Sequence, residues 1–132
     1  MDPPFEAAWE LHTFLTEQSI PYAIIGGGAV QIWGEPRATQ DLDLTIAVPP
    51  ERADATVSAR LGRFAARIPD AAAFARKNRV LLLSASNSVP VDVSLGLPGY
   101  EEGVIARSVL IEIAPGQEVR VCSPEDLIIH KA

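Results

Sequence analysis

The sequence has a single cysteine, Cys122, so no disulfide bond can form within the chain. No His or second Cys stands at metal-ligand spacing from this thiol, and we therefore expect Cys122 to pack in the core. The chain also lacks any apolar run near the ~20 residues that a membrane span requires. Its first residues are acidic and interrupted by prolines, unlike a secretory signal peptide. We expect a cytoplasmic protein that has no membrane partner.

Positive charge is scarce, because the formal net charge is −6. A protein that wraps duplex DNA needs clustered Lys and Arg, so we expect no duplex DNA partner. The basic residues that do gather lie between Arg60 and Arg79. They favour a solvated helical face, with a small basic lip for a triphosphate or an RNA end as the alternative. Neither His12 nor His130 stands beside a nucleophile, which leaves Ser-His-Asp catalysis without support.

The length of 132 residues fits one domain with one core. Hydrophobic periodicity and turn residues predict alternating helices and strands along this length. These segments together predict a single α/β (α+β) domain, in which one mixed sheet has helices packed on it. The predicted helices are residues 5–19, 29–33, 51–67, 70–77 and a last one capped by Ser123, and the predicted strands are residues 22–25, 41–48, 80–84, 89–95, 107–113 and 118–122.

Two aspartates share one face of the predicted strand 41–48. Side chains alternate across a strand, so Leu42 and Leu44 point to one side while Asp41 and Asp43 point to the other. Neighbouring carboxylates repel each other unless a cation lies between them. Mg²⁺ prefers such oxygen ligands together with substrate phosphates and water. Taken alone, the pattern also fits an ordinary half-solvated strand edge.

Two further features point to the same chemistry. Gly26-Gly27-Gly28 follows a buried strand and opens a helix, where backbone N–H groups can bind an anion; the alternative is a tight turn that binds nothing. Asp92 lies inside the apolar strand 89–95, where a charge is costly unless it is paired or bound to a metal. The alternative is that Asp92 lies on the solvent-exposed face of the strand.

In combination these motifs resemble the nucleotidyltransferase (polymerase-beta-like) superfamily. Its signature is a hydrophobic residue, Gly-Gly or Gly-Ser, a spacer, then Asp-hydrophobic-Asp/Glu-hydrophobic, with a third carboxylate on a later strand. The matching residues are Ile25-Gly26-Gly27, Asp41-Leu42-Asp43-Leu44 and Asp92.

A narrower form of the signature is present as well. Gly26-Gly27-Gly28-Ala29 and Arg37-Ala38-Thr39-Gln40-Asp41-Leu42-Asp43 are similar to the nucleotidyltransferases of abortive-infection and toxin–antitoxin systems, and to some antibiotic nucleotidyltransferases. The segment from Ser123 to Lys131 is similar to the one that those proteins carry after the core. The resemblance covers roughly residues 20–131.

The resemblance implies a metal-dependent transfer of a nucleoside monophosphate from a nucleoside triphosphate to an acceptor, with release of pyrophosphate. It implies that Asp41, Asp43 and Asp92 are the catalytic carboxylates and hold Mg²⁺ or Mn²⁺. Backbone N–H groups of Gly26 and Gly27 would face the phosphates. The base and the acceptor, which could be tRNA, another protein or a small molecule, are left open.

Two loop residues are assigned to nucleotide binding by the same resemblance. Arg37 would neutralise charge on the triphosphate, with a loop ion pair to Glu35 as an equal alternative. Thr39 would orient the loop or form a turn, rather than bind the nucleotide or metal directly. Lys131 is either a phosphate contact or a solvated terminal lysine.

The enzymes of toxin systems continue past the position of Lys131 into a helical region, which is absent or cut short in residues 1–132. Two functions therefore stay open. One is an active enzyme, either a toxin or a resistance enzyme, whose protein partner would be a cognate antitoxin or further copies of the same chain. The alternative is a non-catalytic nucleotide- or partner-binding module derived from the same core.

Overall fold

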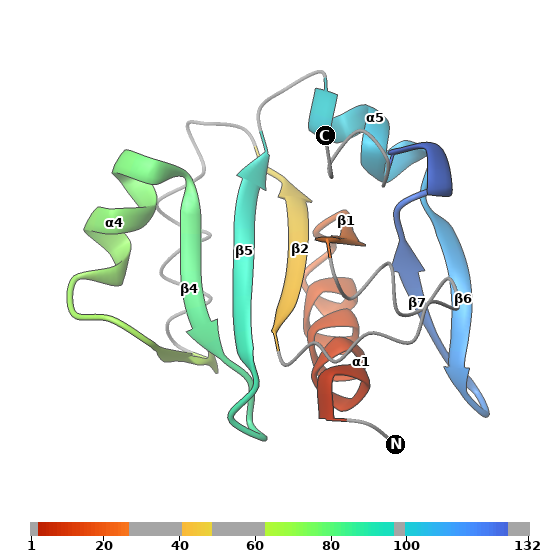
Figure 1. Cartoon of the computed structure of the whole chain (residues 1–132), viewed down its shortest axis with the longest axis horizontal. Coiled ribbons are helices and arrows are strands. Elements are labelled where there is room, and N and C mark those ends of the chain that lie inside the picture. Colours follow the sequence, from red (N-terminus) through yellow and green to blue (C-terminus); the bar gives the residue numbers. More distant parts are fainter. Residues whose placement is uncertain (1–2, 27–40, 49–62, 97–99, 127–132) are drawn as a thin grey trace.

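The computed structural model describes residues 3–26, 41–48, 63–96 and 100–126 (Figure 1). Within these ranges each helix is followed by two or three strands, and a helical turn at 124–126 follows β7 (Gln117–Val121). No described helix has the length and apolar character needed to cross a membrane. The elements are α1 (Pro3–Glu17), β1 (Tyr22–Ile25), β2 (Leu42–Ala47), β3 (Ala65–Ala66), α4 (Ala71–Asn78), β4 (Val80–Ser84), β5 (Pro90–Gly96), α5 (Tyr100–Ala106), β6 (Val109–Ala114) and β7 (Gln117–Val121).

The strands form one seven-stranded sheet in the order β3-β4-β5-β2-β1-β7-β6. Strand β2 pairs antiparallel with β1 and parallel with β5, and β1 pairs parallel with β7. The outer pairs β3–β4, β4–β5 and β6–β7 are antiparallel. The sheet is therefore mixed, and the predicted α+β fold class is confirmed.

Alternation within β2 separates a buried face from a partly open one. Leu42, Leu44 and Ile46 are at most 1% exposed, whereas Asp43 on the opposite face is half-buried. Burying a leucine side chain stabilises the fold by about 2 kcal/mol, so this face sets the orientation of the whole strand. The aspartate is turned away from the core as a consequence.

Helix α1 covers the leucine face of the sheet. Tyr22 is the register partner of Ile46, so the two side chains share that face, and His12 of α1 lies 2.7 Å from the Tyr22 hydroxyl. Leu11 and Leu15 of the same helix are fully buried in the core. Asp43 therefore lies on the side of the sheet opposite α1.

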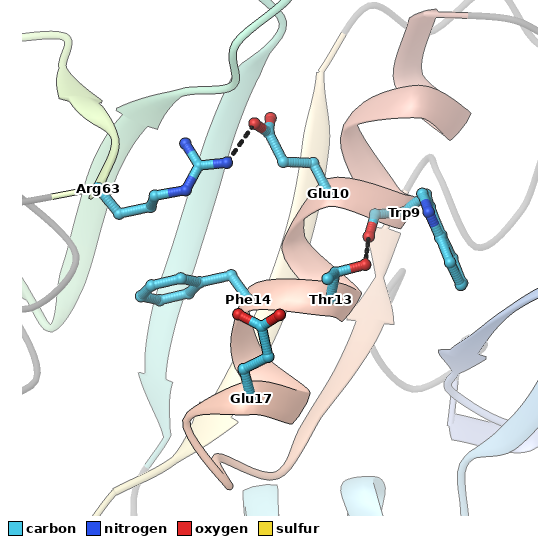
Figure 2. A pocket seen from close by; sticks show the side chains of 6 residues that line it. All are labelled: Trp9, Glu10, Thr13, Phe14, Glu17 and Arg63. Carbon is cyan, nitrogen blue, oxygen red and sulfur yellow. Dashed lines mark hydrogen bonds and ion pairs between the residues drawn. The ribbon is translucent and has the colours of Figure 1, made fainter.

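The Glu10 carboxylate on α1 contacts the turn between β4 and β5. Glu10 accepts hydrogen bonds from the backbone N–H and the hydroxyl of Ser86, and it forms an ion pair with Arg63 at 3.0 Å. Burial raises the pKa of Glu10, but these donors outweigh burial and hold the pKa below its usual value. The pair borders an open pocket of about 380 Å³ (Figure 2), lined by Trp9, Glu10, Thr13, Phe14, Glu17 and Arg63.

Two parts of the predicted secondary structure need correction. Residues 65–66, predicted as the end of a helix over 51–67, form the short strand β3, in which Ala65 pairs with Ser84. The free edge of β4 supplies backbone partners there, and this pairing overrides helix propensity. Helix α5 was not predicted, although its Val104 is fully buried. The predicted helix 29–33 and residues 51–62 lie outside the described residues.

Candidate active site

The sheet brings Asp43 and Asp92 side by side. Strands β2 and β5 are parallel, and these two residues are direct register partners in the pairing. Register partners on adjacent strands project to the same face, so both carboxyl groups lie on the side opposite α1. The Asp92 side chain is 38% exposed and Asp43 is half-buried. Of the two interpretations of Asp92, the structure therefore shows an aspartate on the partly open side of its strand.

Asp41 stands two residues before Asp43 and is exposed at the start of β2. Its charge acts on the same group, because Asp41 and Asp92 both raise the pKa of Asp43 by electrostatic repulsion. The three carboxylates that the sequence singled out thus lie near one another on one face of the sheet.

Gly26 lies beside the Asp43 carboxylate. Ile25, the last residue of β1, is the register partner of Asp43, and Gly26 follows it with a φ of +69°. A Cβ atom placed on Gly26 would lie only 2.7 Å from Oδ2 of Asp43. Only glycine accepts both this backbone conformation and this close approach. The glycine turn therefore leaves room for the Asp43 carboxylate.

Asp43 is the most perturbed acid in this group. Burial comes first, followed by the charges of Asp92 and Asp41 and a hydrogen bond to Asp92; together they raise the pKa of Asp43 to about 6. The charge of Arg67 acts in the opposite direction without cancelling the shift. An excess of negative charge of this kind is relieved by a bound cation.

Arg67 contributes positive charge to the site. Its backbone N–H donates to the carbonyl of Leu82 at 3.0 Å, and Leu82 is in turn the register partner of Asp92. Its guanidinium forms a hydrogen-bonded ion pair with Oδ1 of Asp92. The sequence placed Arg67 on a solvated helical face, and that interpretation is wrong for this residue. Charge alone could not find it, because the contact depends on the pairing of β3 with β4.

The donor set suits a divalent ion of the Mg²⁺ type, which prefers carboxylate oxygens. Asp41, Asp43 and Asp92 supply such oxygens, and burial, followed by the charges of Asp92 and Asp41, raises the pKa of Asp43. Within the described ranges, no three acidic, His or Cys side chains converge tightly enough to hold one ion. The oxygen donors are thus of the kind that Mg²⁺ binds, but they do not converge on one point in this arrangement, in which Arg67 bonds to Asp92.

The other predicted residues divide into two groups. Gly27, Arg37, Thr39, His130 and Lys131 lie outside the described residues. The remaining predictions concern packing and capping, and they are confirmed. Cys122 is fully buried, and Ser123 caps the turn that follows it by accepting the N–H of Asp126 at 3.3 Å.

Comparison with known proteins adds the family. A family model described as the nucleotidyl transferase AbiEii toxin of a type IV toxin–antitoxin system matches residues 15–132. An antigenic nucleotidyltransferase-like protein from Paracoccidioides brasiliensis superimposes with a TM-score of 0.65 at 23% identity, over 97% of this chain and 64% of that one. A candidate nucleotidyltransferase from Thermotoga maritima gives a TM-score of 0.63 at 13% identity, over 99% of this chain and 85% of that one.

These two likenesses show the fold alone, since both identities are low. The chain spans 64% of the length of the fungal protein. A search of curated proteins gives no match.

Proposed function

Because this chain belongs to the AbiEii nucleotidyl transferase family, we propose that it transfers a nucleoside monophosphate from a nucleoside triphosphate to an acceptor. The observation that supports this most directly is the register pairing of Asp43 with Asp92 on adjacent parallel strands. It brings two carboxylates from distant parts of the chain to one face, with Asp41 beside them.

In this proposal Asp41, Asp43 and Asp92 hold Mg²⁺ or Mn²⁺. The bound metal would neutralise phosphate charge and align the attacking and leaving oxygens. Asp43 lies at the centre of the set, since it feels the charges of both other aspartates. The Asp92 side chain is 38% exposed. We assign to it the proton that the acceptor hydroxyl loses.

The transfer then balances as follows. The acceptor oxygen forms a bond to the α-phosphorus, the bond from that phosphorus to the bridging oxygen breaks, and pyrophosphate leaves with the electron pair. Gly26 places the chain close to Asp43, so the phosphates can approach the backbone N–H groups of Gly26 and Gly27. Arg37 and Thr39 would contact the nucleotide from the loop that precedes β2.

The biological setting is part of the proposal. The family is described as a toxin of a type IV toxin–antitoxin system, which supports a cognate antitoxin as the functional counterpart of this chain. The acceptor would be tRNA, another protein or a small molecule. A small molecule would fit a resistance enzyme instead of a toxin.

The test uses triphosphates labelled with ³²P at the α-position. Each of the four ribonucleotides is incubated with the protein, Mg²⁺ or Mn²⁺, and either total RNA or a protein extract. The α-label should move to one acceptor class, whereas a γ-label should appear only in pyrophosphate. Asp43→Asn should abolish the transfer, since it removes the central carboxylate.

Asp70→Asn is the matched control. It makes the same chemical change at an exposed residue that precedes α4 and whose side chain forms no capping hydrogen bond. Its activity should equal that of the unchanged protein. Nucleotide binding without transfer would favour the non-catalytic module, and transfer that survives Asp43→Asn would exclude the proposed site.

A further inference from the structure

One row of residues crosses three neighbouring strands, β2, β5 and β4, and ends at an arginine just past β3. Asp43 pairs with Asp92, Asp92 with Leu82, and the carbonyl of Leu82 accepts the backbone N–H of Arg67. Residues in such a row project to the same face of the sheet. The Arg67 side chain therefore extends over the strand of Leu82 to reach the Asp92 carboxylate. The contact is a consequence of the strand register, and it closes one side of the acidic group.

This ion pair is accessible to exchange. The side chains of Arg67 and Asp92 are 27% and 38% exposed, so neither is locked in the core. Asp92 is the only ion-pair partner of Arg67 within the described residues. Partly exposed ion pairs contribute little to stability, and a divalent ion that binds all three aspartates can displace a single guanidinium.

We propose that Arg67 takes the place of a metal ion on Asp92 in the metal-free protein, and moves to the phosphates of the nucleotide when the metal displaces it. This inference rests on the proposed function, because it assigns a further substrate-binding residue to the same site. A guanidinium released beside a metal–triphosphate complex meets several anionic oxygens at once. It binds such oxygens with paired, charge-assisted hydrogen bonds. One residue would thus couple metal binding to triphosphate binding.

The proposal predicts effects of opposite sign for two ligands. Without Arg67, the metal no longer competes with a guanidinium, so the metal alone should bind more tightly. The metal–triphosphate complex should bind more weakly, since it loses a charge-assisted contact. A merely structural arginine would not produce both changes, whereas one that acts only through its positive charge would, and Arg67→Lys distinguishes that case because it keeps the charge.

The first measurement is Mn²⁺ binding followed by the electron paramagnetic resonance signal of the free ion. Arg67→Gln should bind Mn²⁺ about two- to fivefold more tightly than the unchanged protein, the range expected for release of a partly exposed ion pair. Arg63→Gln is the matched control, because Arg63 pairs with Glu10 and not with the aspartates. Its Mn²⁺ affinity should stay unchanged.

The second measurement uses the α,β-methylene analogues of the four ribonucleoside triphosphates with Mg²⁺, which bind but cannot be cleaved at the α-phosphorus. For the analogue that binds best to the unchanged protein, Arg67→Gln should weaken binding about tenfold or more. Arg67→Lys should recover only part of this loss, because a lysine keeps the charge but lacks the paired donors. Equal or tighter analogue binding in Arg67→Gln would overturn the proposal.

If Arg67→Gln fails to fold, a nuclear magnetic resonance measurement on the unchanged protein still tests the proposal. In the unchanged protein, the Nε–H resonance of Arg67 should shift when Mg²⁺ is added and shift again with the nucleotide analogue. Asp92→Asn distinguishes a failure of the proposed function from a failure of the proposed role of Arg67. If it leaves Mn²⁺ binding intact, the proposed function fails together with this inference. If Asp92→Asn abolishes Mn²⁺ binding, but the Arg67 resonance of the unchanged protein does not shift with the metal or the analogue, only the role of Arg67 is wrong.

Discussion

Gly26, which follows β1, lies so close to Asp43 of β2 that a Cβ atom on Gly26 would be 2.7 Å from Oδ2 of Asp43. Gly26 also has a φ of +69°, a conformation that side-chain-bearing residues rarely adopt. The glycine of the nucleotidyltransferase signature therefore has a structural task in this chain besides any contact with phosphate. It keeps one flank of the central carboxylate open.

The first prediction follows from this contact. Gly26→Ala should displace the Asp43 carboxylate and weaken Mn²⁺ binding about tenfold, in addition to a loss of ~1 kcal/mol or more in stability from the positive φ. Isothermal titration with Mn²⁺ measures the first effect and urea unfolding the second.

Gly116→Ala is the control for backbone strain. Gly116 has a φ of +74°, and a Cβ atom there would meet nothing within 4 Å. This variant should lose similar stability and bind Mn²⁺ normally. Equal Mn²⁺ affinities in both variants would show that the Gly26–Asp43 contact does not position the carboxylate.

The second prediction concerns the loss of folding stability caused by the Asp43 carboxylate. The folded state raises the pKa of Asp43 from 3.8 to about 6. A raised carboxyl pKa means that folding favours the protonated form, so its stabilising contribution is full below pH 3.8 and is lost as the pH rises through about 6. Asp43→Asn should therefore stabilise the metal-free protein at pH 7. The full shift corresponds to about 3 kcal/mol, and partial exposure reduces this to ~1–2 kcal/mol.

Calorimetry in EDTA at pH 7 measures the change, with Asp70→Asn as the control expected within ~0.5 kcal/mol of the unchanged protein. Added Mg²⁺ should raise the melting temperature of the unchanged protein and leave that of Asp43→Asn nearly constant. A less stable Asp43→Asn protein in EDTA would contradict the prediction.

Part of this site could be predicted from the sequence, and the rest could not, for a physical reason. The Leu42–Leu44 alternation is local, so it already placed Asp41 and Asp43 on one face. The place of Asp92 was undecided, because it depends on the register between β2 and β5, which are separated by more than forty residues along the chain. Pairing between distant strands is specified by the packed core and not by local pattern.

Arg67 and helix α5 were missed for related reasons. Arg67 follows an alanine-rich segment that favours a helix, and only the pairing of β3 with the edge of β4 places it beside Leu82. Helix α5 contains Gly103, a poor helix former. The burial of Val104 in the core, which depends on the packing of distant segments, holds this helix in place. Such contacts cannot be inferred from one sequence.

The third prediction concerns His12, which stacks on Trp9 and lies 2.7 Å from the Tyr22 hydroxyl. Burial, and then the charge of Arg120, lower the pKa of His12 below 6.5. The folded state thus favours the neutral ring. Its contribution is present above pH 6.5 and is lost as the pH falls through the lowered pKa.

Paired urea titrations of the unchanged protein and His12→Gln test this dependence. The stability difference between them should shrink by up to ~1 kcal/mol as the pH falls from about 7.5 to about 5, since the ring is only partly buried. Comparing the two proteins cancels the opposite pH dependence of Asp43. A difference that is constant over this window would show that His12 does not titrate with folding.

The fourth prediction concerns the start of the last helical turn. The Asp126 carboxylate is 3% exposed and receives two hydrogen bonds from the Arg107 guanidinium, at 2.9 and 2.8 Å. The hydroxyl of Ser123 donates to the same carboxylate at 3.0 Å. Since breaking a buried ion pair costs about 3–5 kcal/mol and Arg107 is half exposed, Asp126→Ala should cost ~2–3 kcal/mol.

A double-mutant cycle with Arg107→Ala separates the ion pair from the loss of the Ser123 contact. Arg107→Ala leaves the Asp126 charge buried beside Ser123, so it should cost ~1–3 kcal/mol by itself. The double variant should be less destabilised than the sum of the single variants by at least ~1 kcal/mol, because the second substitution removes a group that has already lost its partner. Glu125→Ala, at the exposed neighbouring position, should change the unfolding free energy by less than ~0.5 kcal/mol. Additive single effects would mean that the two residues stabilise the chain separately, and that Asp126 acts through the Ser123 cap and not through the junction with α5.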